Sequence, residues 1–245
     1  MTEAARYAIL PRLGIAPTVH LLVREALDEA IMRAEERSRG AVTVLDAGCG
    51  RVSALRGFRG RIGRMVGADI HEPSEPLPHL DEFRIVDLCG AADGFAPDTF
   101  DVVLSNFTLE HFADPDAAMR NLGRWLRPGG TLVLATVNRR HPFVAAYLGL
   151  PDGPRHLLQP FVKASAADAH PIVGVCNDPM TIRRALERAG FTDIRIQTVG
   201  HLARAWGRHL PTFAVGLVGD LLTGGAPSRR STIVVTATAG TGRPD

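Results

Sequence analysis

A short apolar run followed by an acid and two glycines is the part of this sequence best suited to chemistry. The stretch VLDAGCGRVSAL, residues 44–55, places Asp46 at the end of an expected strand and then Gly48 and Gly50 on either side of Cys49. Glycine lets the backbone approach a bound ligand closely. A strand that runs into such a loop predicts a ligand with a nucleotide part.

The neighbours of the two glycines indicate which nucleotide this is. A dinucleotide loop, G-x-G-x-x-G, would have glycine where this chain has Ser53. A phosphate-binding loop would need a nearby lysine, and Lys163 is the single lysine of the chain. The carboxylate of Asp46 would repel a pyrophosphate but attract an ammonium or sulfonium group. These residues favour S-adenosylmethionine, with S-adenosylhomocysteine as its product, over a nicotinamide dinucleotide.

Polar residues at the ends of the next expected strands agree with this ligand. Asp69 ends the second strand, 19 residues after Gly50, where a carboxylate can accept hydrogen bonds from two ribose hydroxyls. Asp87 ends the third strand, where it can meet an adenine amino group. Ser105 and Asn106 end the fourth strand, beside the point at which the strand order reverses. Ligands of open α/β sheets bind at that point.

Expected strands and helices alternate along the chain, which predicts a mostly parallel sheet with helices on both faces. The alternating elements are strands at 42–46, 64–69, 83–87, 99–105, 131–136, 193–198 and 231–238, with helices at 18–38, 51–58, 113–126 and 179–189.

The length fits one domain, residues 1–245, with a cofactor-binding core at 41–138. A helical segment, 1–40, precedes this core, and a short tail, 240–245, is expected to be disordered. Two long connections interrupt the alternation, and we expect both to form a lid over the ligand. Packing elsewhere or a dimer contact is the alternative for these insertions, which are residues 139–177 and 199–230.

Composition narrows the partners and the compartment. A formal net charge of +2 argues against nucleic acid as a partner. Three scattered cysteines and no signal peptide favour the cytoplasm. The apolar stretch 210–222 is too short to span a bilayer. It favours a hydrophobic lid or homodimer contact over a membrane-surface helix, because its own polar face lacks lysine and arginine.

Five segments in order carry a family resemblance over roughly residues 40–238. They are VLDAGCGR (44–51), GADI (67–70), VDL (86–88), FDVVLSNFTLEHFADP (100–115) and LRPGGTLVLATVN (126–138). The chain resembles the class I S-adenosylmethionine-dependent methyltransferases.

This resemblance implies a Rossmann-like, seven-stranded sheet of order 3-2-1-4-5-7-6 with the last strand antiparallel. It also implies that the loop 48–50 passes under the methionine part of the cofactor. By the same resemblance, Asp69 and Ile70 flank the ribose and adenine, and Asp87 and Leu88 hold the adenine edge.

The chain departs from the family pattern at its third loop glycine, where it has Val52. A β-branched residue does not readily adopt positive φ, so we expect the loop to enter its helix earlier.

TVNRRHPF (136–143) and the run 168–191 resemble a type 11-like branch associated with small molecules, glycans and natural products. This resemblance favours a small-molecule or glycan-like acceptor over a macromolecule.

Three histidines are candidate catalytic residues: His111 in the LEH motif, and His141 and His170 in the branch-like runs. Methyl transfer needs a general base only where the acceptor is a poor nucleophile, and histidine suits that role. We find no spacing typical of a zinc site and expect no metal, although a magnesium-assisted site remains an alternative.

The sequence therefore predicts a methyltransferase that acts on the oxygen or nitrogen of a small molecule. Three other readings stay open at this point. They are a protein that binds S-adenosylmethionine without methyl transfer, an enzyme for a lipid-linked or glycan acceptor, and a nicotinamide oxidoreductase. Methylation of RNA or protein is disfavoured by the near-neutral charge.

Overall fold

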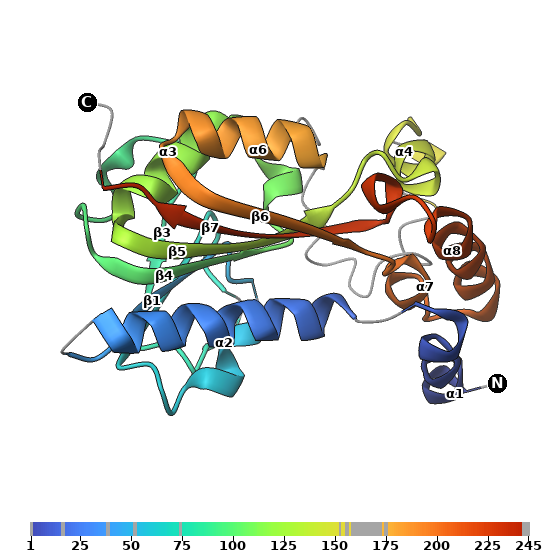
Figure 1. The fold of residues 1–245 in the computed structure, drawn as a ribbon, viewed down its shortest axis with the longest axis horizontal. Coiled ribbons are helices and arrows are strands. Elements are labelled where there is room, and N and C mark those ends of the chain that lie inside the picture. Colours follow the sequence, from blue (N-terminus) through green and yellow to red (C-terminus); the bar gives the residue numbers. More distant parts are fainter. Residues whose placement is uncertain are drawn as a thin grey trace.

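The structure is a computed structural model, and it has a central sheet between layers of helices, with a further group of helices beyond one end of the sheet (Figure 1). The described residues are 2–15, 18–37, 40–50, 53–73, 75–151, 153–154, 157, 173 and 176–241. Three predictions fall on positions outside these ranges. They are the helix entry at Val52, the catalytic role of His170 and, for most of its residues, the disordered tail.

The seven strands lie in the order β3-β2-β1-β4-β5-β7-β6, as predicted. β7 is antiparallel to both β5 and β6, and the other pairings are parallel. Each predicted strand is confirmed, with ends that differ by a few residues. The strands are β1 (Thr43–Ala47), β2 (Arg64–Asp69), β3 (Glu82–Ile85), β4 (Phe100–Asn106), β5 (Leu126–Val137), β6 (Phe191–Val199) and β7 (Thr232–Ala239).

Long helices cover both faces of the sheet (Figure 1). α2 (Val19–Arg37) buries Val23, Leu27 and Ile31 on one face, as their spacing predicts. α3 (Pro115–Trp125) and α6 (Pro179–Arg188) cover the other face. Each of these two helices begins at an aspartate whose side chain accepts backbone N–H groups, and each has proline at its first position.

The helix predicted at 51–58 is wrong in type and in start. A 3₁₀ helix, Ala54–Phe58, occupies this place, and Ser53 caps it by accepting the Leu55 N–H at 3.1 Å. Glycines at 57 and 60 have low helix propensity, so the segment does not extend into a regular α-helix. The described helical turns therefore begin at Ala54, three residues later than the predicted start.

Three separate segments form a helical annex beyond the carboxyl ends of the parallel strands (Figure 1). We define it as residues 2–15, 138–151 and 200–231. Leu10, Ile15, Ala203 and Phe213 form its small core. Its helices are α1 (Glu3–Ile9), α4 (Pro142–Leu148), α7 (Leu202–Ala205) and α8 (Leu210–Thr223), with 3₁₀ helices at Pro11–Leu13 and Pro227–Arg229.

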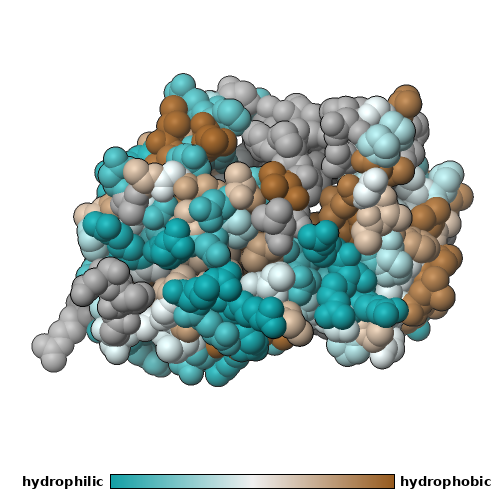
Figure 2. Space-filling view, turned by 90° about the horizontal axis from the view of Figure 1, so that it is seen from above, coloured by the Kyte–Doolittle hydropathy of each residue, from teal (hydrophilic) through white to brown (hydrophobic). Residues whose placement is uncertain are grey.

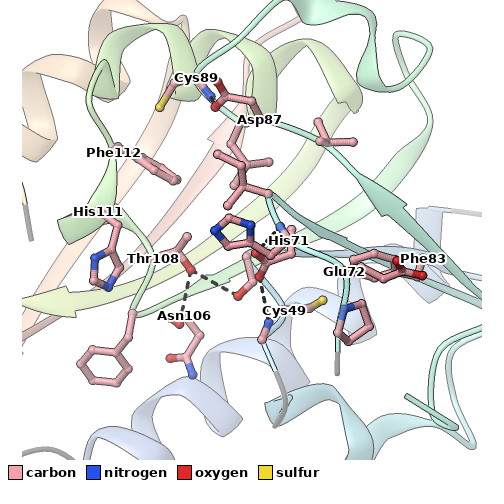
Figure 3. A pocket seen from close by; sticks show the side chains of 18 of the residues that line it. Cys49, His71, Glu72, Phe83, Asp87, Cys89, Asn106, Thr108, His111 and Phe112 are labelled. Atoms are coloured by element: carbon pink, nitrogen blue, oxygen red, sulfur yellow. Dashed lines mark hydrogen bonds between the residues drawn. The ribbon is translucent and has the colours of Figure 1, made fainter. Parts of the chain in front are cut away.

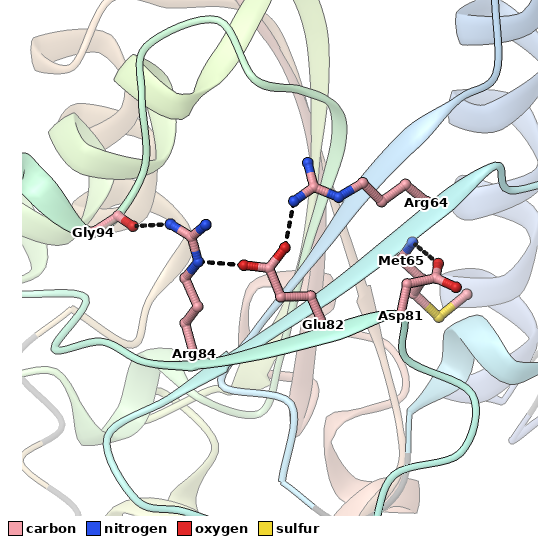
Figure 4. A network of polar contacts seen from close by, with 6 residues as sticks. All are labelled: Arg64, Met65, Asp81, Glu82, Arg84 and Gly94. Carbon is pink, nitrogen blue, oxygen red and sulfur yellow. Dashed lines mark hydrogen bonds and ion pairs between the residues drawn. The ribbon is translucent and has the colours of Figure 1, made fainter.

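A charged network holds the edge strand β3 in place (Figure 4). Glu82 accepts ion pairs from Arg64 and Arg84. The Arg84 guanidinium also donates to the Gly94 carbonyl at 3.1 Å, and Asp81 accepts the Met65 N–H at 2.7 Å. Charged side chains on an edge strand disfavour pairing with another chain. The network also fixes the start of the segment that leads from β3 to Asp87.

Candidate functional site

A cavity of about 650 Å³ opens at the carboxyl ends of the parallel strands β1, β2 and β4. Parallel α/β sheets bind ligands at this edge. Eight of the ten cofactor residues predicted from the sequence line the cavity: Gly48, Cys49, Gly50, Asp69, Ile70, Asp87, Leu88 and Asn106. His111 and Phe112 lie on one side of it, and Glu72 and Phe83 on the other (Figure 3).

The glycine loop after β1 begins with a turn at position 48 that only glycine can adopt without strain. Gly48 has φ of +77° and donates its N–H to the Ala68 carbonyl at 2.7 Å. A Cβ atom at this position would lie 2.3 Å from Thr108 Cγ2. Gly50 also has positive φ, at +49°. The loop therefore lies flat against β2 and Thr108 and leaves the cavity open.

Asp69 joins two loops at the end of β2. Its Oδ2 accepts the Gly50 N–H at 3.1 Å, and its Oδ1 accepts the His71 N–H at 3.3 Å. Each carboxylate oxygen has a second lone pair, so Asp69 can still accept hydrogen bonds from a ligand in the cavity. A pair of ribose hydroxyls matches that capacity.

The wall after β3 combines a carboxylate with apolar side chains. Asp87 Oδ1 accepts the Cys89 N–H at 2.9 Å, so its other oxygen can accept from a ligand amino group. Val86 and Leu88 are buried, and Ile70 is half exposed across the cavity. A flat, mainly apolar ring with one amino edge, such as adenine, fits these residues.

The other two predicted cofactor residues, Asp46 and Ser105, are not among the residues that line the cavity. Both are buried, and Asp46 Oδ2 and Ser105 Oγ have no hydrogen-bond partner among the described residues. Burial raises the pKa of Asp46 to about 7, the charge of Asp69 adds to this, and Ser53 opposes it. A cation held nearby would favour the ionised carboxylate.

Cys49 lies on the loop itself, and its thiol is not a nucleophile in this environment. Burial and the carboxylates of Asp46 and Asp69 raise its pKa to about 12. The thiolate is the reactive form of cysteine, so a thiol with this pKa stays inert near neutral pH.

Aromatic residues and a histidine form the end of the cavity after β4. Phe107 has φ of +57°, and its ring stacks on His201 of the annex, with centroids 6.3 Å apart. His111 ends a 3₁₀ helix, Leu109–His111, and lines the same cavity. Sequence reasoning missed Phe107 because positive φ at a phenylalanine leaves no signal in the sequence.

Behind Phe107, a histidine of the annex packs against a histidine of α2, a contact that the sequence did not reveal. His201 meets His20 of α2 edge to face at 5.5 Å. Burial, with the nearby His20 and Arg204, lowers the pKa of His201 to about 3. His201 is therefore neutral at physiological pH and acts as an aromatic packing surface.

A buried polar chain supports the segment that carries His111. Glu110 Oε2 accepts from Thr136 Oγ1 at 2.8 Å, and Thr136 Oγ1 accepts from the Asn177 amide at 2.7 Å. Glu110 is 4% exposed. The chain ties the 3₁₀ helix to β5, so the position of His111 is set from within the core.

The structure does not bring His141 to this cavity. His141 is fully buried at the N-terminus of α4, where its Nδ1 accepts the Phe143 and Val144 N–H groups at 3.2 and 3.4 Å. A Cβ at Gly219 of α8 would lie 2.9 Å from its ring. His141 therefore packs α4 against α8. The third predicted histidine, His170, lies outside the described residues.

The residues present fit S-adenosylmethionine. The open glycine loop leaves room for its amino-acid part. Asp69 can accept hydrogen bonds from its ribose, and the apolar wall before Asp87 suits its adenine. The unpartnered Asp46 oxygen lies behind the loop, where a cationic ligand group would stabilise it. Within the described ranges, no three His, Cys, Asp or Glu side chains are grouped to hold a metal ion.

Comparison with known proteins places the chain among methyltransferases. The sequence model of the family described as "Methyltransferase domain" matches residues 20–196. The ubiquinone biosynthesis O-methyltransferase of Parvibaculum lavamentivorans is 32% identical over 183 residues, which cover 65% of this chain and 71% of that protein.

Solved structures share the fold. An S-adenosylmethionine-dependent methyltransferase from Mesorhizobium loti aligns over 86% of this chain and 99% of its own, with 21% identity and a TM-score of 0.51. The geranyl diphosphate C-methyltransferase of Streptomyces coelicolor, in complex with S-adenosyl-L-homocysteine, aligns over 86% and 79%, with 14% identity and a TM-score of 0.54.

Proposed function

The chain belongs to the class I S-adenosylmethionine-dependent methyltransferases, and from this premise we propose that it methylates an oxygen or nitrogen atom of a small molecule. When bound, S-adenosylmethionine supplies a methyl group on a positively charged sulfur. The residues of this chain bind and align the reactants around that group.

We assign cofactor binding to the loop 48–50 and to Asp69, Ile70, Asp87 and Leu88. The loop backbone and the Asp69 carboxylate are held together by the hydrogen bond from Gly50, so they form a preorganised surface. Asp46 lies behind the loop, where a bound cation would favour its ionised form. Alignment of two reactants in this way contributes about 7–11 kcal/mol to lowering a barrier in favourable cases.

A hydroxyl group on a ring is the acceptor that the cavity supports best. The single observation behind this is that His111, Phe107 and Phe112 line the end of the cavity that the cofactor residues leave open. Aromatic side chains stack on a flat ring, and an imidazole can take the proton of a hydroxyl. The relative from Parvibaculum lavamentivorans is named as an O-methyltransferase, which agrees with this choice.

The test is formation of S-adenosylhomocysteine from S-adenosylmethionine with matched acceptors. Hydroxylated ring compounds should give product, and the same rings with the hydroxyl already methylated should give none. His111→Ala should lower turnover by roughly 10²–10⁴-fold with a hydroxyl acceptor. Turnover with amines alone, at a rate that His111→Ala leaves unchanged, would refute both the hydroxyl acceptor and the role of His111.

A further inference from the structure

The helix α8 exposes an apolar face without a polar counterpart. At 3.6 residues per turn, its exposed residues fill an arc of about 140°. Val218 is 49% exposed and Leu222 is 70% exposed. The opposite face packs into the annex through Phe213. The exposed face consists of Leu210, Pro211, Ala214, Val215, Val218, Leu221 and Leu222.

This face is unusual for a helix at the surface. A surface helix normally presents polar residues to water, and a contiguous apolar patch marks an interaction site. Figure 2 shows hydrophobic residues gathered at the end of the molecule where Figure 1 places α8. Something apolar is therefore expected to cover α8 in the working state of the protein.

The charge around α8 indicates what covers it. The annex contains eight arginines, at positions 6, 12, 139, 140, 204, 208, 229 and 230, against Glu3 and the buried Asp220. Its formal charge is thus +6, while the whole chain has +2, so the remainder of the chain is acidic. The basic charge is concentrated on the part of the protein that carries the apolar face.

Several of these arginines are available to an external anion. Arg12, Arg140, Arg208 and Arg229 are exposed, and none of them forms an ion pair with a described residue. Arg208 lies two residues before α8, and Arg229 lies six residues after it, at the end of the 3₁₀ helix Pro227–Arg229. Along the chain, exposed arginines therefore lie on both sides of α8.

We propose that the α8 face docks the protein onto the surface of an anionic phospholipid bilayer. An apolar helix face with flanking arginines binds such a surface by burying the apolar side chains and by attraction to acidic headgroups. A second copy of this chain would bring a +6 annex against another, which opposes dimerisation through this face. The 14 residues of α8 extend about 21 Å, and such a helix lies in the interface plane.

The sequence alone disfavoured docking at a membrane surface because α8 carries no basic residue of its own. Four of the eight annex arginines lie in the same segment as α8, and the other four come from the segments 2–15 and 138–151, which are distant from it in sequence. The proposal does not depend on the acceptor, although the Phe107–His201 contact joins the annex to the cavity wall. A docked protein would therefore hold its cavity near the bilayer.

The test is co-sedimentation of the purified full chain with vesicles of phosphatidylcholine, with and without phosphatidylglycerol. The paired variant Val218→Ser and Leu222→Ser removes apolar area from α8. The matched control is Leu21→Ser with Met32→Ser, which replaces two exposed apolar side chains on α2. Arg208→Gln with Arg229→Gln tests the charge. Affinity for S-adenosylhomocysteine confirms that each variant is folded.

Wild type and the α2 control should bind vesicles that contain phosphatidylglycerol, and added salt should weaken this binding. The α8 variant should bind at least about tenfold more weakly, because each buried aliphatic side chain contributes that much or more. The arginine variant should lose the preference for phosphatidylglycerol. Absence of wild-type binding, or equal binding by the α8 variant, would overturn the proposal. A wild-type dimer that the α8 variant dissociates would assign the face to a second copy instead.

Discussion

The backbone N–H of Gly50 donates a hydrogen bond to Asp69 Oδ2 at 3.1 Å, so the glycine loop after β1 and the end of β2 form one unit. The two residues are 19 positions apart in the chain, and the parallel pairing of β1 with β2 brings them together. Asp69 therefore holds the loop and also faces the cavity.

Asp69→Ala should weaken the binding of S-adenosylhomocysteine by about 10- to 100-fold, because it removes charged hydrogen bonds both to the ligand and to the loop. Isothermal titration calorimetry measures the change. Glu72→Gln is the control, since Glu72 lines the same cavity and should leave the affinity within about threefold. Wild-type affinity in Asp69→Ala would show that the ribose assignment is wrong.

Gly48→Ala should destabilise the fold by about 2–4 kcal/mol. The positive φ is strained for alanine, and its Cβ would overlap Thr108. Urea denaturation gives the free energy of unfolding. Gly57→Ala is the matched control, because a Cβ there meets nothing within 4 Å, and its effect should stay within about 0.5 kcal/mol. If the two substitutions have equal effects, the close contact with Thr108 does not exist.

Asp46 should make the wild-type protein less stable as the pH rises. Its pKa is 3.8 in the unfolded chain and about 7 in the folded protein, so the folded state holds an extra proton between these values. The contribution of Asp46 to the free energy of unfolding is fully present below about pH 4 and is lost as the pH rises through about 7.

Asp46→Asn should remove this dependence. Between pH 5 and pH 8, wild type should lose about 2.5 kcal/mol more than the variant. His201, with its lowered pKa, has the opposite dependence, but it is present in both proteins and cancels in the comparison. Denaturant unfolding at the two pH values provides the measurement. If the free energy of unfolding changes equally in the two proteins between these pH values, Asp46 is not protonated near neutral pH.

His111 and His141 should respond differently to replacement by alanine. His141→Ala removes the N-cap of α4 and a buried ring, so unfolding should become easier by about 1–2 kcal/mol. His111→Ala should leave cofactor affinity nearly unchanged and reduce turnover. Thermal unfolding and calorimetry on both variants separate these roles. A large loss of cofactor affinity in His111→Ala would move His111 out of the acceptor end.

The strand order and most of the cavity could be predicted from the sequence. Apolar runs alternate with helical patterns, and each run ends in a polar residue such as Asp69 or Asp87, which then meets the others at one edge of a parallel sheet. These features depend on local pattern and on the family resemblance, so one sequence is sufficient to find them.

Other parts of the site depend on how distant segments meet. The sequence predicts that Asp46 faces the ligand as a charged group, but it is buried behind the cavity wall, and burial raises its pKa to about 7. His141 belongs to a family-like run, yet its contact with α8 takes it into the annex core. The basic surroundings of α8 likewise come from three segments. Pattern along one segment does not reveal such contacts.

The most direct test of the central claim is a thermal shift with S-adenosylmethionine, S-adenosylhomocysteine and NAD in parallel. At a hundredfold excess over Kd, a true ligand adds about 2.7 kcal/mol, which raises Tm by roughly 5 °C for a chain of this length. We predict this shift with both adenosyl-sulfur ligands, none with NAD, and a smaller shift in Asp69→Ala. A shift with NAD alone, or none with S-adenosylhomocysteine, would contradict the assignment of the cavity.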